Sequence, residues 1–586
     1  MTTDRRVPVE SLAFAGLLLA GLWLRLRQPS FPPFSEAESW HAVQAALETP
    51  APPPLASLAA LGGPTNASYH ALTVVLFQWF GTGDLVARLV PIAAGLLLIL
   101  LPLLVRRRQG RRETLMAIAL MAISPALVTV SRTPGGPAVA LLGVAFTGLS
   151  LMDAWDRRAP PTLLARTWPV GVGVAVCSGP SGWTGLLALL VAVGAYLLHR
   201  RRASGAWEMP VFDRSALLAA IGLGFLLSTG FGLAPSGLTA VASGLAAWLQ
   251  GWTRAGMLGP LSFVLALIVF EPLSTFLGLT RGVRPSGGPG PGERWLLIWA
   301  LAGLAVPLLY PAREAGDLIW SVLPLILLAG LAVRDLDVPA EDSATAASRM
   351  AMVAVLMLLG FFSYLQISSF LLGLAPGFDP LGNPNLSLLI GLLAVGLGIV
   401  MLVLFALGWS RPAAIQAGRQ AAGLLLLLAS LGAVWRLNFG DPAMHAGDLW
   451  RSDATSPQQA QLRQTLTMVA EPSRVSADPV TLLAEGSLPA SLVWTLRQVP
   501  IIPAVGYQLQ SSPGVLLTPE QGSLPLPSDY VGQTFSLSER RDWGMLSPTE
   551  AVRWWLRGTG ATAQQRWIIL IRSDLASPDI IPPESQ

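Results

Sequence analysis

The residues with the clearest capacity for chemistry stand together early in the chain, in the stretch FPPFSEAESWHAVQAALETP. It contains Glu36, Glu38 and His41, and a carboxylate in such a place can accept the proton of an attacking hydroxyl group. Ser35 and Glu38 also have the spacing of a capping box, which predicts that a helix begins near Ser35. Glu38 can therefore be a catalytic base or a helix cap, whereas Glu36 stands outside that pattern.

Arginines form the second group of interest, and Arg88, Arg132 and Arg313 all lie beside long apolar runs. A guanidinium group can bind two oxygens of one phosphate, so several of them on one face suit a lipid-linked phosphate. Each arginine taken singly can equally be an interfacial anchor or half of a local ion pair. Only the combination of arginines with carboxylates predicts a phosphate-binding site.

The composition defines the setting of these groups. Hydrophobic residues make up 52% of the 586, charged residues 12%, and the mean hydropathy is +0.56, which predicts a chain that lies largely in a membrane. The basic residues are all arginines and are spread over short loops, so the sequence does not predict nucleic-acid binding. The single cysteine, Cys177, excludes an intramolecular disulfide and a thiolate metal cluster, and no histidines have metal-ligand spacing.

The apolar runs predict about thirteen membrane-spanning helices. We expect them at about 10–27, 86–105, 113–131, 136–153, 168–180, 182–198, 215–234, 258–280, 294–311, 317–333, 350–373, 386–409 and 418–437. No small-residue cleavage site follows the first run, so we expect a retained span. Residues 28–85 form the first outward loop, in which 69–80 is too short for a span and suits an interfacial helix, as does 235–257.

The arginines also predict the orientation of the chain. With the N-terminus in the cytoplasm, the inner segments hold about three times as many arginines as the outer ones, RRRQGRR at 106–112 among them. Thirteen spans then place the C-terminus outside, and we expect a multi-pass protein of the inner (plasma) membrane. Residues 1–437 are thus the transmembrane domain.

The composition changes after residue 437, where apolar runs shorten and Pro, Ser, Gln and Asp increase. Ser491–Val499 resembles a helix and Arg566–Arg572 a buried strand, separated by Pro and Gly turns. Residues 438–586 are therefore predicted to form a small extracytoplasmic α/β domain. The expected fold class is an all-α polytopic membrane domain followed by this domain.

The order of these elements resembles the GT-C superfamily of membrane glycosyltransferases, in the branch of the protein O-mannosyltransferases and aminoarabinose transferases. The resemblance rests on the acidic loop FSEAESWHA, on residues 69–132 from YHALTVVLF to ALVTVSR, and on YPAREAGDLIWSVLPLILLAG. The tail, with LVWTLRQVP, DYVGQTFSL and AVRWWLRGTG, is similar to the extracytoplasmic domain of uncharacterised bacterial members. The match covers most of residues 10–440.

The resemblance implies transfer of a sugar from a polyprenyl-phosphate carrier, itself a membrane lipid, with inversion at the anomeric carbon. It implies Glu36, or Glu38, as the catalytic base and Arg88, Arg132 or Arg313 as the groups that stabilise the departing phosphate. His41 and Tyr69 are the further substrate-binding residues that it implies. It names no protein partner.

Two departures from the family pattern leave alternatives open. The family's Asp-Glu pair is Ser35-Glu36 here, and TPGGPA after Arg132 lacks the acid that often follows, which leaves divalent-metal binding unsupported. The chain can therefore be an active transferase or a catalytically silent GT-C-like subunit with a binding or assembly role. A transporter is the weakest alternative, because ionisable residues are almost absent from the middles of the expected spans, Glu271 lying near one end of its helix.

Overall fold

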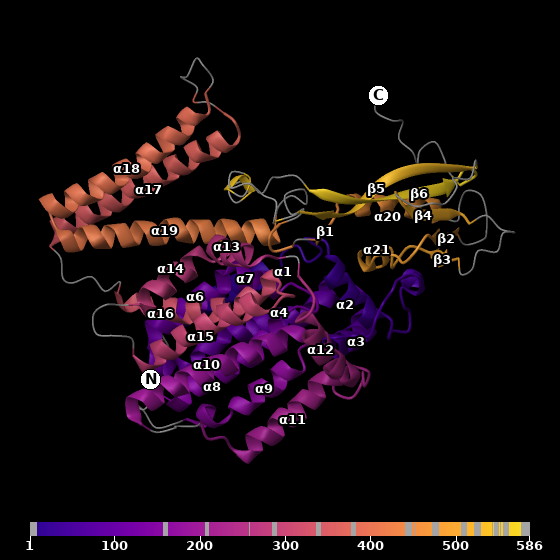
Figure 1. Cartoon of the computed structure of the whole chain (residues 1–586), viewed down its shortest axis with the longest axis horizontal. Coiled ribbons are helices and arrows are strands. Elements are labelled where there is room, and N and C mark those ends of the chain that lie inside the picture. The colour runs from indigo at the N-terminus through magenta and orange to yellow at the C-terminus, as the bar shows by residue number, and fades with distance from the viewer. Residues whose placement is uncertain are drawn as a thin grey trace, which may run out of the picture.

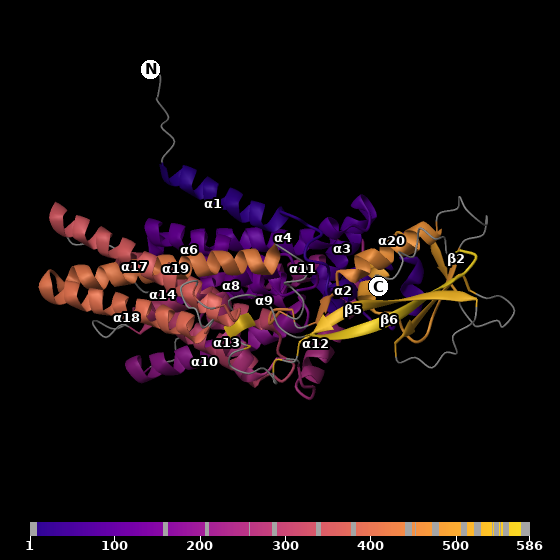
Figure 2. The ribbon, with the colours of Figure 1, turned by 90° about the horizontal axis from the view of Figure 1, so that it is seen from above.

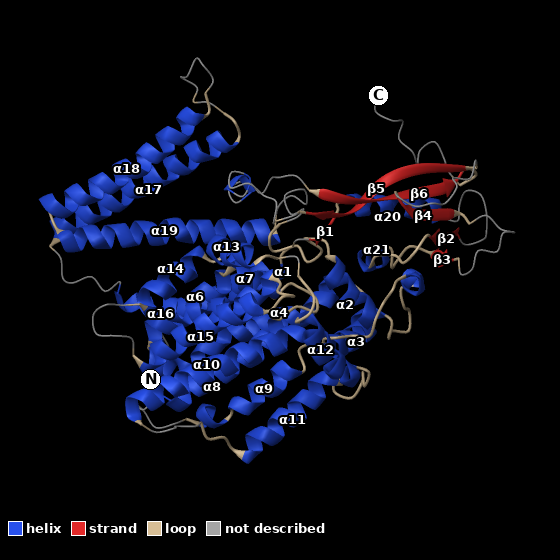
Figure 3. Ribbon diagram, in the orientation of Figure 1, coloured by secondary structure: helices blue, strands red, loops and turns tan. Residues whose placement is uncertain are grey.

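The computed structural model describes residues 9–155, 162–205, 210–256, 258–283, 290–335, 342–374, 376, 383–439, 448–451, 453–470, 480–504, 513–520, 529–541, 543, 550, 552–554 and 562–575. The chain forms a helical membrane domain with a sheet-containing domain at one end (Figures 1 and 2). Figure 3 shows that the strands gather in this second domain. The predicted fold class is confirmed.

The membrane domain consists of nineteen helices and short 3-10 turns. The helices are α1 (Val9–Leu26), α2 (Glu36–Ala46), α3 (Ala67–Phe80), α4 (Asp84–Leu100), α5 (Arg106–Gln109), α6 (Arg111–Ile123), α7 (Pro125–Val130), α8 (Ala138–Trp155), α9 (Trp168–Val176), α10 (Pro180–Ser204), α11 (Arg214–Ser228), α12 (Gly237–Gly251), α13 (Pro260–Phe270), α14 (Pro272–Gly282), α15 (Pro291–Leu309), α16 (Ile319–Leu331), α17 (Ser343–Leu371), α18 (Asn385–Gly408) and α19 (Arg411–Asn438). The nineteen are those found among the described residues.

The predicted number of membrane-spanning helices, thirteen, can be compared with the helices of the structure. Among the described residues, eight helices are long and apolar enough to cross a membrane, or nine if the bent pair α13 and α14 counts as one span. Every one of the thirteen predicted runs coincides with a helix or a broken pair of helices. Outside the eight or nine are α1, α9, α11 and the pair α6 and α7, so thirteen crossings remain a prediction.

Two predicted spans are broken at proline. The run 113–131 divides into α6 and α7 at Ser124, and the run 258–280 bends by 95° at Glu271, because each following proline begins a new helix. The Glu271 carboxylate joins the two breaks: it accepts hydrogen bonds from the Ser124 hydroxyl and from the backbone N–H of Ala126, at 2.9 Å for the latter. It also accepts one from the Ser274 hydroxyl at 2.9 Å.

The centre of the membrane domain is α16, whose residues are buried throughout. The fully buried indoles of Trp295, Trp299 and Trp320 fill the space around α15 and α16. By contrast, α17 and α18 lie against each other and α19, at the edge of the helical body (Figure 1), and most of their apolar side chains are exposed. Those side chains suit a lipid environment.

The C-terminal domain is built on a six-stranded sheet with the order β1-β5-β6-β4-β2-β3. Its elements are β1 (Asp453–Thr455), α20 (Gln458–Ala470), β2 (Val480–Ala484), α21 (Ala490–Thr495), β3 (Ile501–Pro503), β4 (Val515–Pro519), β5 (Tyr530–Arg540) and β6 (Ala563–Arg572). β2 pairs in parallel with β3 and β4, and the other pairs are antiparallel. The predicted helix at 491–499 overlaps α21, and the predicted strand at 566–572 lies within β6.

The segment between α1 and α4 and the C-terminal domain share one hydrophobic core. Trp494 of α21 stacks on Phe34 and Phe77, with ring centroids 5.5 and 5.9 Å apart. Its indole N–H donates to Asp84 at 3.0 Å, and Arg497 donates to the same carboxylate oxygen at 2.9 Å. The domain is therefore fixed against α2, α3 and the start of α4.

Candidate active site

Arg88 holds the loop that leads from α1 to α2. Its side chain is fully buried in α4, and its Nη1 donates to the carbonyl oxygens of Pro29 and Phe31 at 2.8 and 2.9 Å. Its Nη2 donates to the carbonyl oxygen of Pro32 at 2.6 Å, and the guanidinium lies 4.7 Å from the centre of the Phe34 ring. Arg88 thus fixes the backbone just before the acidic motif.

Arg132, in the turn between α7 and α8, binds the same loop and is also fully buried. Its Nη1 donates to the carbonyl oxygens of Leu24 at 3.0 Å and Arg27 at 2.7 Å. Its Nη2 donates to those of Gln28 at 2.9 Å and Phe31 at 2.6 Å. The terminal nitrogens of both arginines are therefore occupied by backbone carbonyls, and this arrangement supports a positioning role.

Glu38 lies beside these arginines, at the start of α2. The capping box predicted from the sequence is present: the Glu38 N–H donates to Ser35 Oγ at 3.3 Å, and the Ser35 N–H donates to Glu38 Oε2 at 2.7 Å. The cap uses only Oε2. The other carboxylate oxygen, Oε1, lies 3.6 Å from a terminal nitrogen of Arg451, and both side chains are more than nine-tenths buried. Glu38 therefore combines the structural role with a carboxylate oxygen that the cap leaves free.

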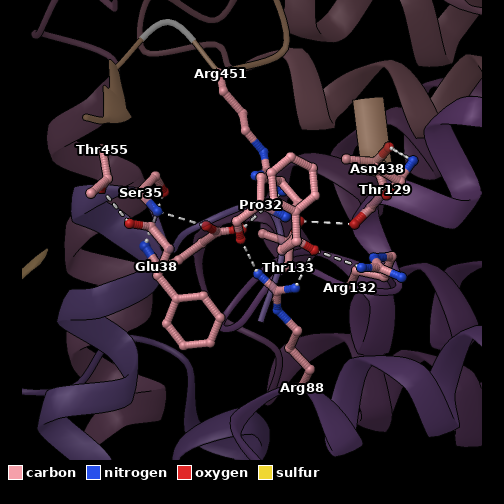
Figure 4. Close-up of polar contacts among 12 residues, drawn as sticks. Pro32, Ser35, Glu38, Arg88, Thr129, Arg132, Thr133, Asn438, Arg451 and Thr455 are labelled. Carbon is pink, nitrogen blue, oxygen red and sulfur yellow. Dashed lines mark hydrogen bonds and ion pairs between the residues drawn. The ribbon is translucent and has the colours of Figure 1, made fainter. Parts of the chain in front are cut away.

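Arg451 was not among the predicted site residues. It comes from the short segment 448–451 that precedes β1, and Figure 4 shows it entering the site from the side opposite Arg88. Neither Nη1 nor Nη2 has a hydrogen-bond partner among the described residues, although both are buried. A buried guanidinium without hydrogen-bond acceptors is costly unless an anion can reach it. Nothing in the local sequence GDLWR signals this role, because docking of the C-terminal domain creates the site.

Glu36 points away from the arginine group. Its two carboxylate oxygens accept hydrogen bonds from the backbone N–H groups of Ala490 at 2.5 Å and Ser491 at 3.0 Å. These are orphan donors at the N-terminus of α21, where a negative charge is favourable. The structure thus separates the two candidate bases: Glu38 faces the arginines, and Glu36 faces the C-terminal domain.

His41 and Tyr69 form an aromatic contact behind the site, with ring centroids 5.8 Å apart. The Tyr69 hydroxyl donates to the carbonyl oxygen of Ala87 at 3.0 Å. Gly135, at φ +68°, lies against the imidazole, and a Cβ there would come within 2.1 Å of it. Burial lowers the pKa of His41 to about 4, and nearby His70 adds to the shift. His41 is therefore neutral at pH 7, and its contact with Tyr69 of α3 helps to hold α2 in place.

Arg313 is placed at a different position. It donates through Nε to the carbonyl oxygen of Pro307 at 3.1 Å, and through Nη1 to that of Leu258 at 2.8 Å. Its Nη2 donates to the carbonyl oxygen of Leu308 at 3.1 Å. The bonds to Pro307 and Leu308 cap the C-terminal end of α15, a favourable place for a cation. No contact between Arg313 and the Glu38 group is found in the described part of the chain.

In the part of the chain that the structure describes, no three His, Cys, Asp or Glu side chains lie close enough together to hold a metal ion. The charged groups gathered around Glu38 are instead Arg88, Arg132 and Arg451. One carboxylate facing three guanidinium groups can bind an anion and accept a proton in the same place.

Comparisons with known proteins give a structural similarity only. No protein-family model matches this sequence, and no curated protein sequence matches it significantly. The structure is similar to a crystal structure of ArnT from Cupriavidus metallidurans bound to undecaprenyl phosphate, with TM-score 0.49, 14% identity and coverage of 97% of this chain and 98% of that one. The apo state of ArnT gives TM-score 0.48, 13% identity and coverage of 97% and 99%.

Proposed function

We propose that this protein is a membrane glycosyltransferase of the GT-C type, which transfers a sugar from a polyprenyl-phosphate carrier to an acceptor on the extracytoplasmic side. The observation that carries the proposal is the pair formed by Glu38 and Arg451. A carboxylate oxygen left free by its helix cap lies 3.6 Å from a buried guanidinium nitrogen that lacks a hydrogen-bond partner among the described residues. The resemblance of most of residues 10–440 to the GT-C superfamily supports the same assignment.

The chemistry divides between these two residues. Glu38 Oε1 accepts the proton of the acceptor hydroxyl, whose oxygen then forms a bond to the anomeric carbon. The bond from that carbon to the phosphate oxygen breaks on the opposite face, and the configuration inverts. The lipid phosphate leaves with the electron pair, and the Arg451 fork stabilises the growing negative charge where preorganised donors act most strongly.

Glu38 and Arg451 are 3.6 Å apart in this structure, so Arg451 must turn away from Glu38 to meet a phosphate on the face of the sugar opposite the base. Their contact is an ion pair without a hydrogen bond, so an incoming phosphate can take over the Arg451 donors without first breaking one. Once Arg451 turns to the phosphate, Oε1 is free to accept a proton. Arg88 and Arg132 keep the loop in place and contribute positive potential, with their terminal nitrogens on backbone carbonyls.

The proposed orientation follows the arginine distribution in the sequence, with the N-terminus in the cytoplasm and the C-terminal domain outside. Glu38 and Arg451 lie where the two domains meet, so the reaction would take place at the outer membrane surface. The phosphate of the donor would lie at that surface and its polyprenyl chain among the helices. The membrane in question is the inner (plasma) membrane.

A non-catalytic role is the second candidate, and one observation favours it. The Glu36 carboxylate and the terminal nitrogens of Arg88 and Arg132 are engaged by backbone groups, as in a scaffold. A binding or assembly subunit built on the GT-C scaffold would keep these contacts. It would not need the free oxygen of Glu38.

The test compares Glu38→Gln with wild type in proteoliposomes supplied with radiolabelled polyprenyl-phosphate sugars. Glutamine also serves at the third position of a capping box, so this variant keeps the start of α2 and loses only the base. We expect donor turnover in wild type and a loss of about 10²-fold or more in the variant. Glu520→Gln, at an exposed position in the C-terminal domain, is the matched control and should retain turnover.

Two results would contradict the assignment. Equal turnover by wild type and Glu38→Gln would remove Glu38 from the mechanism. Donor binding without transfer or hydrolysis, for every common donor sugar, would favour the non-catalytic role. In that case, activity gained by Ser35→Asp would show that the scaffold has lost its base.

A further inference from the structure

A cavity lies between the two domains, on the other side of α2 from Arg451. Its volume is about 300 Å³, and its walls come from α2, the loop at 59–61, the segment before α21 and the strands β1, β5 and β6. The backbone N–H of Leu488 donates to the carbonyl oxygen of Leu58 at 2.9 Å, which joins the segment before α21 to the start of the loop at 59–61. The volume is at the lower end of the range for small-molecule sites, roughly 300–1,000 Å³.

The cavity is acidic. Its lining includes the carboxylates of Glu36 and Asp453, and none of the described residues that line it is basic. Burial raises the pKa of Asp453, the nearby Glu36 adds to the rise, and Arg540 on β5 opposes it. The Glu36 oxygens are held by two backbone N–H groups, so they face the cavity as fixed hydrogen-bond acceptors. A phosphate or carboxylate ligand would be repelled here, whereas a ligand rich in hydroxyl donors would not.

The remaining lining suits a sugar ring. Trp40 contributes aromatic surface, with a smaller share from Trp567, which is 4% exposed. Ser538 and Gln565 contribute a hydroxyl and an amide that can both donate and accept. The Ser538 hydroxyl donates to the Gln565 amide oxygen at 3.2 Å, which orders this edge of the cavity. A polyol offers alternating donors and acceptors around an apolar ring face, and these side chains match both features.

Helix geometry keeps this cavity separate from the phosphate site. Residues two apart in an α-helix point about 200° apart around its axis. Glu36 and Glu38 therefore face opposite sides of α2, toward the C-terminal domain and toward Arg451 respectively. One side of α2 faces carboxylates and hydroxyl groups, and the other side faces arginines.

We propose that this cavity binds a saccharide without phosphate or carboxylate groups, as the glycan end of the acceptor. The role as acceptor site rests on the proposed function, but saccharide binding itself does not. Because the walls come from both domains, a bound glycan would contact α2 and the sheet at once. It would thereby be anchored beside the helix that carries Glu38.

The test measures binding by purified full-length protein in nanodiscs to an array of neutral glycans, with the 6-phosphates of glucose, mannose and N-acetylglucosamine as anionic counterparts. We expect affinity for at least one neutral glycan and at least tenfold weaker binding of its phosphorylated form. Asp453→Asn and Gln565→Ala should each weaken neutral binding about tenfold or more. Gln565 is an exposed residue on β6, so its variant tests the site without a folding defect.

The controls separate this inference from the catalytic one. Arg566→Gln removes an exposed neighbour of Gln565 that does not line the cavity, and it should bind glycans as wild type does. Glu38→Gln should lose turnover and keep glycan binding. Turnover without any glycan binding, or binding unchanged in both cavity variants, would overturn the inference alone. Glycan binding in a protein that turns over no donor would overturn the proposed function alone.

Discussion

Arg88 and Arg132 donate to the same carbonyl oxygen, that of Phe31, at 2.9 and 2.6 Å. One arginine belongs to α4 and the other to the turn after α7, so a single backbone atom joins two separate parts of the helical body. Together they hold residues 24–32, the segment that places the acidic motif. The geometry of Glu38 therefore depends on two arginines that do not bind it directly.

The shared oxygen predicts non-additive effects on stability. Arg88→Met and Arg132→Met should each lower the free energy of unfolding by about 2–4 kcal/mol, because each leaves buried carbonyls unpaired. The double variant should lose less than the sum, since either substitution alone releases much of the loop. Chemical denaturation of the three variants in detergent measures this, and strict additivity would show that the two arginines act independently.

Substitution of Arg451 should specifically impair turnover of the polyprenyl-phosphate sugar donor. Arg451→Gln should lower kcat/KM for the polyprenyl-phosphate sugar by about 10²–10³-fold, by analogy with the loss of an oxyanion donor. Arg451→Lys should recover part of this, because it keeps the charge and loses the two-pronged geometry. Arg572→Gln, which removes an exposed ion pair with Asp574, is the control. A wild-type rate in Arg451→Gln would remove the phosphate role.

The contacts of Trp494 should contribute strongly to the docking of the C-terminal domain on the helical domain. Trp494→Ala removes the stack on Phe34 and Phe77 and the bond to Asp84, and it should cost about 3–5 kcal/mol. Limited proteolysis should then release the C-terminal domain faster than in wild type. Trp79→Ala is the matched control, because that side chain is 67% exposed. Equal proteolysis of the Trp494 variant and wild type would place the main docking contact elsewhere.

His41 predicts a loss of stability in acid. The folded protein holds the pKa of His41 at about 4, against 6.5 in the unfolded chain, so between these values only the unfolded state binds the proton. The contribution of neutral His41 to the free energy of unfolding is complete above pH 6.5 and decreases as the pH falls toward 4. At pH 5 the loss is up to about 2 kcal/mol. Thermal unfolding at pH 7 and 5 should therefore differ less in His41→Gln than in wild type. His199→Gln, at an exposed position, should leave the difference unchanged.

The sequence was most informative about helices. Long apolar runs identify them because nothing but burial or lipid can accommodate such side chains, and Ser35 with Glu38 gave a capping box that the structure confirms. The breaks at Ser124-Pro125 and Glu271-Pro272 were missed, although serine before proline is a helix-start signal. Hydropathy averages over such positions, which is why both runs were predicted as continuous spans.

The site was predicted less completely because docking determines which side chains meet. Helix periodicity separates Glu36 from Glu38, but it does not say which of them faces arginines. That depends on α21, whose N-terminus receives Glu36, and on the segment that carries Arg451. Both come from the far end of the chain, and no local pattern connects them with residues 35–41.

The carboxylate of Glu271 has a consequence for the biogenesis of the protein. The first turn of α7 depends on it, since Glu271 accepts the hydrogen bonds of Ser124 and of the Ala126 N–H. A ribosome completes α7 long before it reaches Glu271, so the newly made segment must wait in the membrane with those donors unsatisfied or hydrated. The final packing of α7 therefore follows the synthesis of residue 271, and the order of synthesis is not the order in which the bundle closes.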